Sequence, residues 1–441
     1  MTASDRPLRI ALLMYQGNPY SGGQGVYIHY LSRELARMGH DVHVLAGPPL
    51  PVVPPGVTLH PIESYSTWML MDDKKGYIRR LQEKPFSLFY PLNFLEYLTT
   101  RGSVFSLIIA FSVRAFMKLR ELHEEQPFDV IHDNQSMGFG SLAMKALGIP
   151  MVVTIHHPLP IDRLNSIIQA RNPYERVRRV MFYPVGMQEF VAKRMDALIT
   201  VSKASAGKIE ETFGIPAEQM EVVYNGIDTD VFRPLPDVEP EPRSIVWVGN
   251  SEDRNKGVKY LLEAAAMLRD EGVDFRLVLK DRDRRQLKYA PSLINHLRLG
   301  TRTTFLTRMP PEELVRLYNR AEIVVSPSVF EGFGLPAAEA MSCGRPLIAT
   351  TGGAFPEVVE HEKSGLLVPP ADPVALAAAI RRLLDDPAER ERLGAAARER
   401  IVSTFNWGLA TEQTLRVYRG VLDRRSPAAL PIPVSPASAP A

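Results

Sequence analysis

The chain has 441 residues, of which 45% are hydrophobic and 23% are charged, and its formal net charge is +2 at pH 7. A single hydrophobic core rarely organises a chain of this length, so two domains are expected. The composition is typical of a soluble globular protein, and the small net charge gives no general indication of nucleic-acid binding. The single cysteine, Cys343, excludes an internal disulfide and indicates a reducing compartment, which favours a cytoplasmic location.

The termini and the hydrophobic runs indicate a protein that is not integral to a membrane. The first seven residues are polar and short, so no secretory signal is expected. The most apolar run, residues 104–117, contains Arg114 and falls short of the ~20 residues that a spanning helix needs. Residues 424–441 end the chain in a stretch rich in Pro, Ala and Ser, which predicts a disordered tail.

The first half of the chain alternates hydrophobic runs with helical segments. A strand is predicted at residues 8–14, then a glycine-containing turn, a helix from about 26 to 38, and a strand at 42–45. Further strands are expected at 130–132, 152–155 and 197–200. Short buried strands joined by helices predict a parallel sheet covered by helices. The glycine turn does not have the spacing of the dinucleotide-binding fingerprint and is a weak signal alone.

A second alternation follows a segment that is typical of an interdomain linker. Residues 226–243 begin with Gly-Ile-Asp and continue with a run rich in Pro, Glu and Asp. Strands are expected beyond it at 244–249, 275–280, 321–327, 346–349 and 365–368, and helices at 259–269, 312–319 and 406–423. The second half therefore predicts another α/β sheet.

The most informative stretch, residues 328–344, places two carboxylates around a Gly-Phe-Gly turn. A strand precedes it, and Pro336 suits the first residue of a helix, where its fixed φ and missing N–H cost nothing. Glu331 therefore falls on the loop and Glu339 in the first turns of the helix. A helix start favours a diphosphate, and a carboxylate can accept two hydrogen bonds from a sugar diol. The spacing alone fits two surface glutamates beside an ordinary turn equally well.

With its surroundings, this stretch resembles the donor-site signature of family 4 of the retaining, nucleotide-sugar-dependent glycosyltransferases, which have the GT-B fold. The resemblance covers nearly the whole chain and is strongest from 222 to 407. It implies an α/β protein with two Rossmann-like domains facing across a cleft, and a C-terminal helix crossing back to the N-terminal domain. The implied acceptor-binding domain is 1–225 with the crossover helix 406–423, the linker is 226–243, and the donor-binding domain is 244–405.

The resemblance also implies roles for residues that follow the strands. Lys256 and Arg254 would stabilise the leaving diphosphate. The family usually has arginine directly after the strand glycine, where this chain has Asn250 in a loop one residue longer, so Lys256 is the closer match and Arg254 a replacement. Gly22 and Gly23 would touch the phosphates or the sugar.

A histidine and the two glutamates would contact the donor directly. His156 would contact the sugar near the reacting carbon, although His157 directly follows and the choice between them stays open. Glu331 would bind hexose hydroxyls and Glu339 the ribose diol. Backbone amides would come from Phe333, Gly334 and Leu335, and the base would lie near Arg308 and Met309. Lys280 stands where the family often has glycine, so the donor pocket is expected to differ there.

No metal site and no cofactor are expected beyond the nucleotide-sugar co-substrate. Metal-dependent transferases carry an Asp-x-Asp motif at a strand end. Residues 281–283 have that form, but their arginine-rich surroundings favour a solvated turn.

The acceptor is expected to be an alcohol bound by the N-terminal half, and the sequence does not identify it. Residues 64–119 hold many aromatic side chains among basic ones, and a second basic stretch runs from 171 to 194. The aromatic residues of the first stretch are Trp68, Tyr77, Phe86, Phe89, Tyr90, Phe94, Tyr97 and Phe105, and the basic ones are Lys74, Lys75, Arg79, Arg80, Lys84 and Arg101. Such mixtures suit transient contact with an anionic membrane surface, here the inner face, and suit helices that cover a sheet equally well.

Three functions therefore remain. The first is a metal-independent retaining hexosyltransferase that uses a nucleoside diphosphate sugar. The second is a nucleotide-sugar epimerase on the same scaffold, which would form its product without an acceptor. The third is a non-catalytic GT-B binding module. This alternative remains because Asn250 and Lys280 depart from the residues that the family has at these positions.

Overall fold

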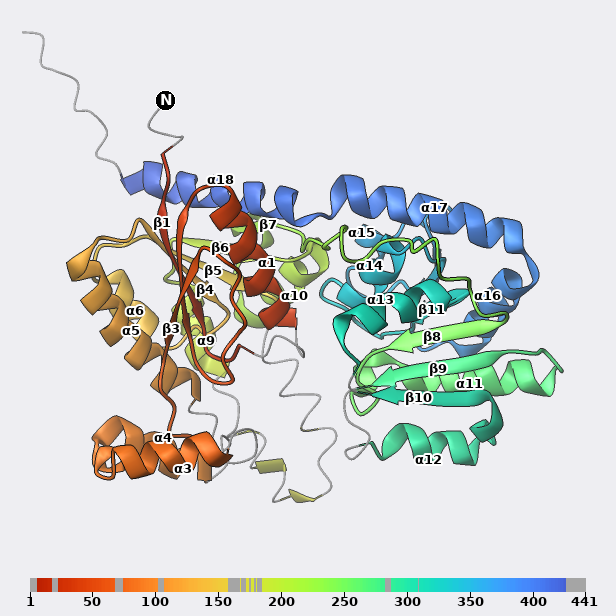
Figure 1. The fold of residues 1–441 in the computed structure, drawn as a ribbon, viewed down its shortest axis with the longest axis horizontal. Coiled ribbons are helices and arrows are strands. Elements are labelled where there is room, and N and C mark those ends of the chain that lie inside the picture. Colours follow the sequence, from red (N-terminus) through yellow and green to blue (C-terminus); the bar gives the residue numbers. More distant parts are fainter. Residues whose placement is uncertain are drawn as a thin grey trace, which may run out of the picture.

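The computed structural model describes residues 6–17, 23–67, 74–101, 107–157, 167, 172–173, 176–177, 180, 185–281, 287–307 and 309–425. Two parallel sheets lie side by side, each with helices packed around it (Figure 1). The predicted α/β class with two sheet-containing halves is confirmed. Within the described part of the chain, no helix is both long and apolar enough to cross a membrane.

The N-terminal sheet has seven parallel strands in the order β3-β2-β1-β4-β5-β6-β7. Their bounds are β1 (Arg9–Met14), β2 (Asp41–Ala46), β3 (Val57–Pro61), β4 (Val130–Asn134), β5 (Met151–Ile155), β6 (Ala197–Thr200) and β7 (Met220–Val222). The five predicted strands are confirmed, and the two edge strands β3 and β7 were not predicted because they are short and less completely buried.

Alternate residues of β1 point to opposite faces of the sheet, as strand geometry requires. Ile10 and Leu12 pack with α1 and α18, whereas Ala11 and Leu13 pack with α5. The helices of this half are α1 (Gly23–Arg37), α3 (Lys74–Glu83), α4 (Pro91–Arg101), α5 (Leu107–Glu125), α6 (Gly140–Lys145), α9 (Val185–Ala192) and α10 (Lys203–Phe213). Helix α1 begins three residues before the predicted start, so its first turn includes Gly23.

The C-terminal sheet has six parallel strands in the order β10-β9-β8-β11-β12-β13. They are β8 (Ser244–Val248), β9 (Arg276–Asp281), β10 (Thr303–Thr307), β11 (Ile323–Ser326), β12 (Leu347–Thr350) and β13 (Leu366–Val368). The sequence pattern predicts all of them except the half-exposed edge strand β10. The helices are α11 (Val258–Asp270), α12 (Tyr289–His296), α13 (Pro311–Arg320), α14 (Leu335–Ser342), α15 (Phe355–Val358), α16 (Pro373–Asp385), α17 (Pro387–Thr404) and α18 (Trp407–Arg425).

Helices α17 and α18 run end to end across both halves (Figure 1). Helix α17 packs against α14 of the C-terminal half, and α18 packs against α1 of the N-terminal half. Between them, the Asn406 side chain caps α18 by accepting a hydrogen bond from Leu409 N at 2.9 Å. The predicted crossover helix is confirmed, and it continues to Arg425, two residues into the segment predicted as a tail. Residues 426–441 lie outside the described residues.

Candidate active site

Lys256 and Glu331 form an ion pair at the carboxyl ends of β8 and β11. The Lys256 ammonium donates to both carboxylate oxygens of Glu331, at 2.8 and 3.0 Å. Asn255 holds the two loops together, because its side chain donates to Phe330 O at 2.6 Å and its carbonyl accepts from Val329 N at 2.8 Å. The pair is partly exposed, so both groups remain within reach of a ligand.

Two glycines allow these loops to approach each other. Gly257 follows Lys256 with φ +67°, and a Cβ there would lie 1.8 Å from Pro327 O. Gly334 precedes α14 with φ +90°, and a Cβ there would lie 2.7 Å from the ring of Phe355. Only glycine adopts both backbone shapes without strain. The first helical residue is Leu335, so Pro336 occupies the second position instead of the predicted first.

Glu339 projects from α14 toward Tyr318 of α13. The Tyr318 hydroxyl donates to Glu339 Oε2 at 2.9 Å. Burial raises the pKa of Glu339 to about 7, while this hydrogen bond and the charge of Lys280 lower it. The carboxyl group therefore titrates much closer to neutral pH than an ordinary glutamate, and the binding of a group that donates hydrogen bonds would favour the ionised form.

His156 follows β5 and is held by residues at the end of the neighbouring strand β4. Its Nε2 lies 2.7 Å from Asn134 Oδ1, and its backbone N–H donates to Gln135 Oε1 at 2.6 Å. The Tyr27 ring packs against it in a T-shaped arrangement, with ring centroids 4.8 Å apart. Burial, together with His157, lowers the pKa of His156 to about 3, so the imidazole is neutral.

The Gln135 side chain also holds the backbone of His157, and we call this pair of contacts the Gln135 clamp. The His157 backbone N–H donates to Gln135 Oε1 at 3.2 Å, and the His157 carbonyl accepts from Gln135 Nε2 at 2.7 Å. Gln135 itself has φ +60°, an uncommon conformation for a residue with a side chain, and such conformations concentrate at functional sites. The clamp fixes the position of both histidines.

Loops from the two halves meet at this place. A Cβ on Gly332 would lie 3.1 Å from His156 O, and a Cβ on Gly23 would lie 3.5 Å from Leu335 Cδ1. The Ser205 hydroxyl, in the first turn of α10, lies 3.4 Å from His156 O and 3.3 Å from Gly332 O. The structure therefore brings Gly23 and His156 of the first half to the glutamate turn of the second.

A further carboxylate joins the halves next to this contact. Glu357 of α15 accepts hydrogen bonds at 2.8 Å from both Lys203 N and Ala204 N at the start of α10, and at 2.9 Å from the Tyr224 hydroxyl. A carboxylate at a helix N-terminus satisfies donors that lack an intrahelical partner. Glu357 thus fixes the two halves relative to each other near the site.

The other predicted donor-site residues have varied surroundings. Arg254 is exposed, and its guanidinium lies over the Tyr289 ring at 5.4 Å from the ring centroid. Met309 is partly buried beyond β10, Phe333 packs its ring into the core, and Leu335 begins α14. Gly22 and Arg308 lie outside the described residues.

The expectation that residues 281–283 form a solvated turn is wrong for Asp281. This residue ends β9, is fully buried, and accepts a hydrogen bond from Ser251 N at 3.1 Å. It therefore anchors the loop that carries Lys256. Among the described residues, no three side chains of His, Cys, Asp or Glu cluster closely enough to hold a metal ion.

The sequence did not indicate Asn134, Gln135, Ser205, Tyr318 or Glu357. Asn134 and Gln135 follow a predicted strand whose neighbour ends in His156, and polar residues at adjacent strand ends are a usable signal. The other three depend on contacts between distant segments, for which the sequence pattern gives no indication.

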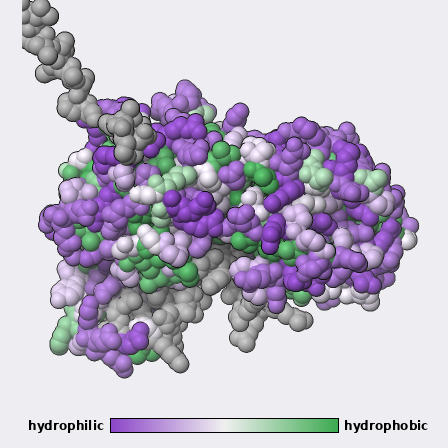
Figure 2. Space-filling view, turned by 45° about the horizontal axis from the view of Figure 1, so that its top comes forward, coloured by the Kyte–Doolittle hydropathy of each residue, from purple (hydrophilic) through white to green (hydrophobic). Residues whose placement is uncertain are grey.

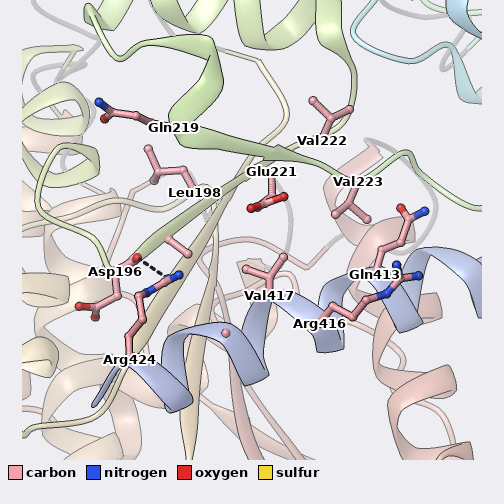
Figure 3. Close-up of a pocket in the computed structure, with 12 residues that line it drawn as sticks. Asp196, Leu198, Gln219, Glu221, Val222, Val223, Gln413, Arg416, Val417 and Arg424 are labelled. Carbon is pink, nitrogen blue, oxygen red and sulfur yellow. Dashed lines mark hydrogen bonds between the residues drawn. The ribbon is translucent and has the colours of Figure 1, made fainter. Parts of the chain in front are cut away.

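A separate pocket of about 410 Å³ lies between the β6–β7 edge and α18, away from the residues described above (Figure 3). Arg424 donates to Asp196 O across it at 3.4 Å. It contains none of the predicted site residues.

Comparisons with known sequences match both halves to glycosyltransferases. The family described as Glycosyltransferase Family 4 matches residues 21–231, and the family described as Glycosyl transferases group 1 matches residues 231–400. The MMP α-(1→4)-mannosyltransferase of Mycolicibacterium hassiacum is 38% identical over 421 residues, which are 95% of this chain and 99% of that protein. A glycogen synthase of Mycobacterium tuberculosis is 29% identical over 93% of this chain and 94% of that protein.

Solved structures show the same architecture. Sucrose-phosphate synthase from Thermosynechococcus elongatus superposes with a TM-score of 0.72 at 25% identity, covering 94% of this chain and 100% of that one. Anabaena HepE, solved in complex with UDP-glucose, superposes with a TM-score of 0.65 at 18% identity over 93% of this chain and 99% of that one.

Proposed function

Since the chain belongs to family 4 of the glycosyltransferases and has their GT-B fold, we propose that it moves a hexosyl group from a nucleoside diphosphate sugar to an alcohol, with retention and without a metal ion. The observation that carries this proposal is the ion pair between Lys256 and Glu331, on a turn that contacts His156 O and leads into the helix that carries Glu339. Lys256, Glu331 and Glu339 come from the C-terminal half, and His156 comes from the N-terminal half.

The leaving diphosphate would bind between Lys256 and the start of α14. Departure of the nucleotide places negative charge on the diphosphate, and a fixed ammonium and helix N–H groups stabilise that charge in the transition state. In the ligand-free protein Lys256 is paired with Glu331 at 2.8 Å. Donor binding would share the ammonium between the two anions, so that Glu331 also orients the sugar hydroxyls. Arg254 would add positive charge if it leaves the Tyr289 ring.

Glu339 would hold the ribose diol. The hydrogen bond from Tyr318 occupies Oε2 and fixes the carboxyl plane, which leaves Oε1 as an acceptor for the ribose hydroxyls. Because two hydroxyls donate better to a carboxylate than to a carboxylic acid, binding should be linked to release of the proton from Glu339.

His156 would contact the sugar as a neutral imidazole. Asn134 Nδ2 donates to Gln24 O, so its Oδ1 accepts from His156 Nε2–H, and Nδ1 is the acceptor nitrogen of the ring. This tautomer can accept a hydrogen bond from a sugar hydroxyl as positive charge develops at the reacting carbon. Retention then requires that the acceptor hydroxyl lie on the diphosphate face of the sugar.

The first experiment is a calorimetric titration of UDP, GDP and ADP, with and without a chelator, against the wild-type protein and Glu339→Ala. Chelator-independent binding of one nucleotide that the substitution weakens would support the proposal. Glu391→Ala, an exposed carboxylate on α17, is the matched control. Absence of binding by all three nucleotides, or binding that requires a metal ion, would contradict it.

The donor sugar and the stereochemistry follow from product analysis. The name of the 38% identical relative, a mannosyltransferase, makes mannose the first sugar to test, beside glucose, each on the nucleotide that the titration selects, with a panel of methyl glycosides as acceptors. NMR of the product gives the anomeric configuration. An inverted linkage would overturn the proposal of retention while leaving the transferase activity intact.

A further inference from the structure

Helix α4 turns its polar residues inward. Glu96 is 1% exposed and accepts hydrogen bonds from Ser64 Oγ at 2.6 Å, Tyr65 N at 2.9 Å and Arg114 Nη1 at 2.6 Å. Asn93 accepts from Arg114 Nη2 at 2.6 Å and donates to Ser87 O at 2.8 Å. These buried polar groups are satisfied, so they hold the helix in one rotational position.

The opposite face of α4 and the turn before it present large apolar side chains to solvent. Phe94, Leu95 and Leu98 are 48%, 49% and 54% exposed, and positions 94 and 98 are neighbours on one helix face. Phe86, Phe89 and Tyr90, beside the 3₁₀ turn η2 (Ser87–Phe89), are 77%, 73% and 66% exposed. We call these six residues the α4 face.

The fold itself does not account for the α4 face. Single exposed hydrophobic residues are normal, but six of them within residues 86–98 form a concentration that marks an interaction site. Rotating the helix about its axis to bury them would break the ion pair between Glu96 and Arg114, whose atoms are 2.6 Å apart, and would leave one of these charges buried without its partner. Figure 1 places α3 and α4 together on a projection from the N-terminal half, and Figure 2 shows hydrophobic surface among hydrophilic residues on that projection.

The charge of the segment distinguishes between partners. Residues 74–101 contain six basic residues and two acidic ones, a balance of +4 in a chain whose net charge is +2. One of the two acidic residues, Glu96, is buried against Arg114, so it does not offset the surface charge. A second copy of the same positive surface would be repelled, whereas an anionic headgroup layer would be attracted.

We infer that the α4 face is a reversible docking surface for an anionic lipid bilayer. The six apolar side chains would enter the boundary between headgroups and acyl chains, and the exposed basic residues Arg79, Lys84 and Arg101 would contact the headgroups. This inference goes beyond the proposed transfer reaction, because it concerns where the enzyme works and not what it transfers.

Flotation with vesicles tests the inference. The wild-type chain is mixed with vesicles of phosphatidylcholine alone or of phosphatidylcholine with phosphatidylglycerol, at low and at high salt. We expect binding to the anionic vesicles, weaker binding at high salt, and at least a tenfold smaller bound fraction for Phe94→Ser/Leu98→Ser. The matched control is Val374→Ser/Val402→Ser, two exposed apolar residues of the C-terminal half, which should bind as the wild type does.

Nucleotide affinity and thermal unfolding of each variant establish that it is folded, and Phe89→Ser on the neighbouring turn provides an independent variant. Wild-type protein that stays with the soluble fraction overturns the inference. Equal binding to neutral vesicles, or unchanged binding by both α4-face variants, overturns it as well. A dimer in light scattering that Phe94→Ser/Leu98→Ser dissociates would assign the face to a second copy instead.

Discussion

The two halves contribute to the site in different ways. The C-terminal half supplies ionisable groups, Lys256, Glu331 and Glu339, from strand–turn–helix units that are short in sequence. The N-terminal half supplies a neutral histidine, His156, which depends on two residues of another strand. The C-terminal half thus contributes charged groups and the N-terminal half a neutral polar group. This division suits the proposed reaction, in which the anionic donor must bind tightly while the acceptor is exchanged. The comparison predicts that substitutions in the first group remove charge stabilisation and those in the second remove orientation.

The largest effect is expected for Lys256→Ala. In the proposed reaction, loss of the ammonium removes the fixed positive charge at the leaving diphosphate, and one such electrostatic group contributes about 10²–10³ in rate. Steady-state transfer assays should show a fall in kcat of this size. Lys256→Arg keeps the charge and should retain most of the activity. Equal loss in both variants would mean that packing of the loop, and not charge, is what Lys256 provides.

His156→Ala tests the contribution of the N-terminal half and should lower kcat about 100-fold, since removing one positioned hydrogen-bonding group that stabilises transition-state charge costs about 10²–10³. Because the pKa of His156 is lowered to about 3, its protonation cannot shape the rate profile above pH 5. His157→Ala is the paired variant. If that substitution costs more than His156→Ala, then His157 is the histidine that contacts the sugar.

Glu339, in the C-terminal half, predicts that nucleotide affinity depends on pH. Its pKa is raised to about 7, and the proposed contact with the ribose would favour the ionised form, so nucleotide affinity should rise with pH. Between pH 6 and 8 the gain should be about tenfold, as for one group that must lose its proton on binding. Calorimetry in buffers of different ionisation enthalpy would measure both the affinity and the released proton.

Tyr318→Phe tests whether Glu339 is the group that sets the pH dependence of nucleotide affinity. The phenol hydrogen bond lowers the pKa of Glu339, so its removal should move the midpoint of the affinity profile to higher pH and weaken binding at pH 7. An unchanged midpoint would mean that Glu339 does not contact the nucleotide.

The smallest effect is expected at the contact between the halves. Ser205→Ala removes a hydroxyl that lies 3.4 Å from His156 O and 3.3 Å from Gly332 O. Hydrogen bonds of this length contribute about 0.5–1 kcal/mol, so KM for the donor should rise about threefold with little change in kcat. A large fall in kcat would show that the hydroxyl acts in the reaction itself.

The same difference between the halves decides how much the sequence could predict. The Glu331–Glu339 unit is local, and strand, turn and helix signals placed it correctly within one residue of the helix start. The Lys256–Glu331 pair joins the ends of β8 and β11, which are neighbours in the sheet, so knowledge of the strand order would suffice to predict it.

The rest depends on contacts that a sequence pattern does not encode. Gln135 adopts φ +60°, a backbone conformation that the residue type does not predict. The contact of Ser205 with Gly332 O depends on how the two sheets are placed relative to each other. Asp281 was expected in solvent because arginines surround it in sequence, yet the strand end buries it. Helix α4 exposes Phe94, Leu95 and Leu98 and buries polar residues, which is opposite to the orientation that amphipathic patterning normally predicts.

The chain crosses between the halves twice, and the two crossings lie against each other. Ile227 N donates to Phe405 O at 2.7 Å, and Ile227 pairs with Asn406 as an isolated parallel bridge. Because the two covalent connections pair with each other, they restrain relative movement of the halves at one place, near Ile227 and Asn406. The hydrogen bonds from α10 to Glu357 form a second connection between the halves, apart from the paired chain segments. A rotation that moves the glutamate turn away from His156 would have to break these hydrogen bonds first.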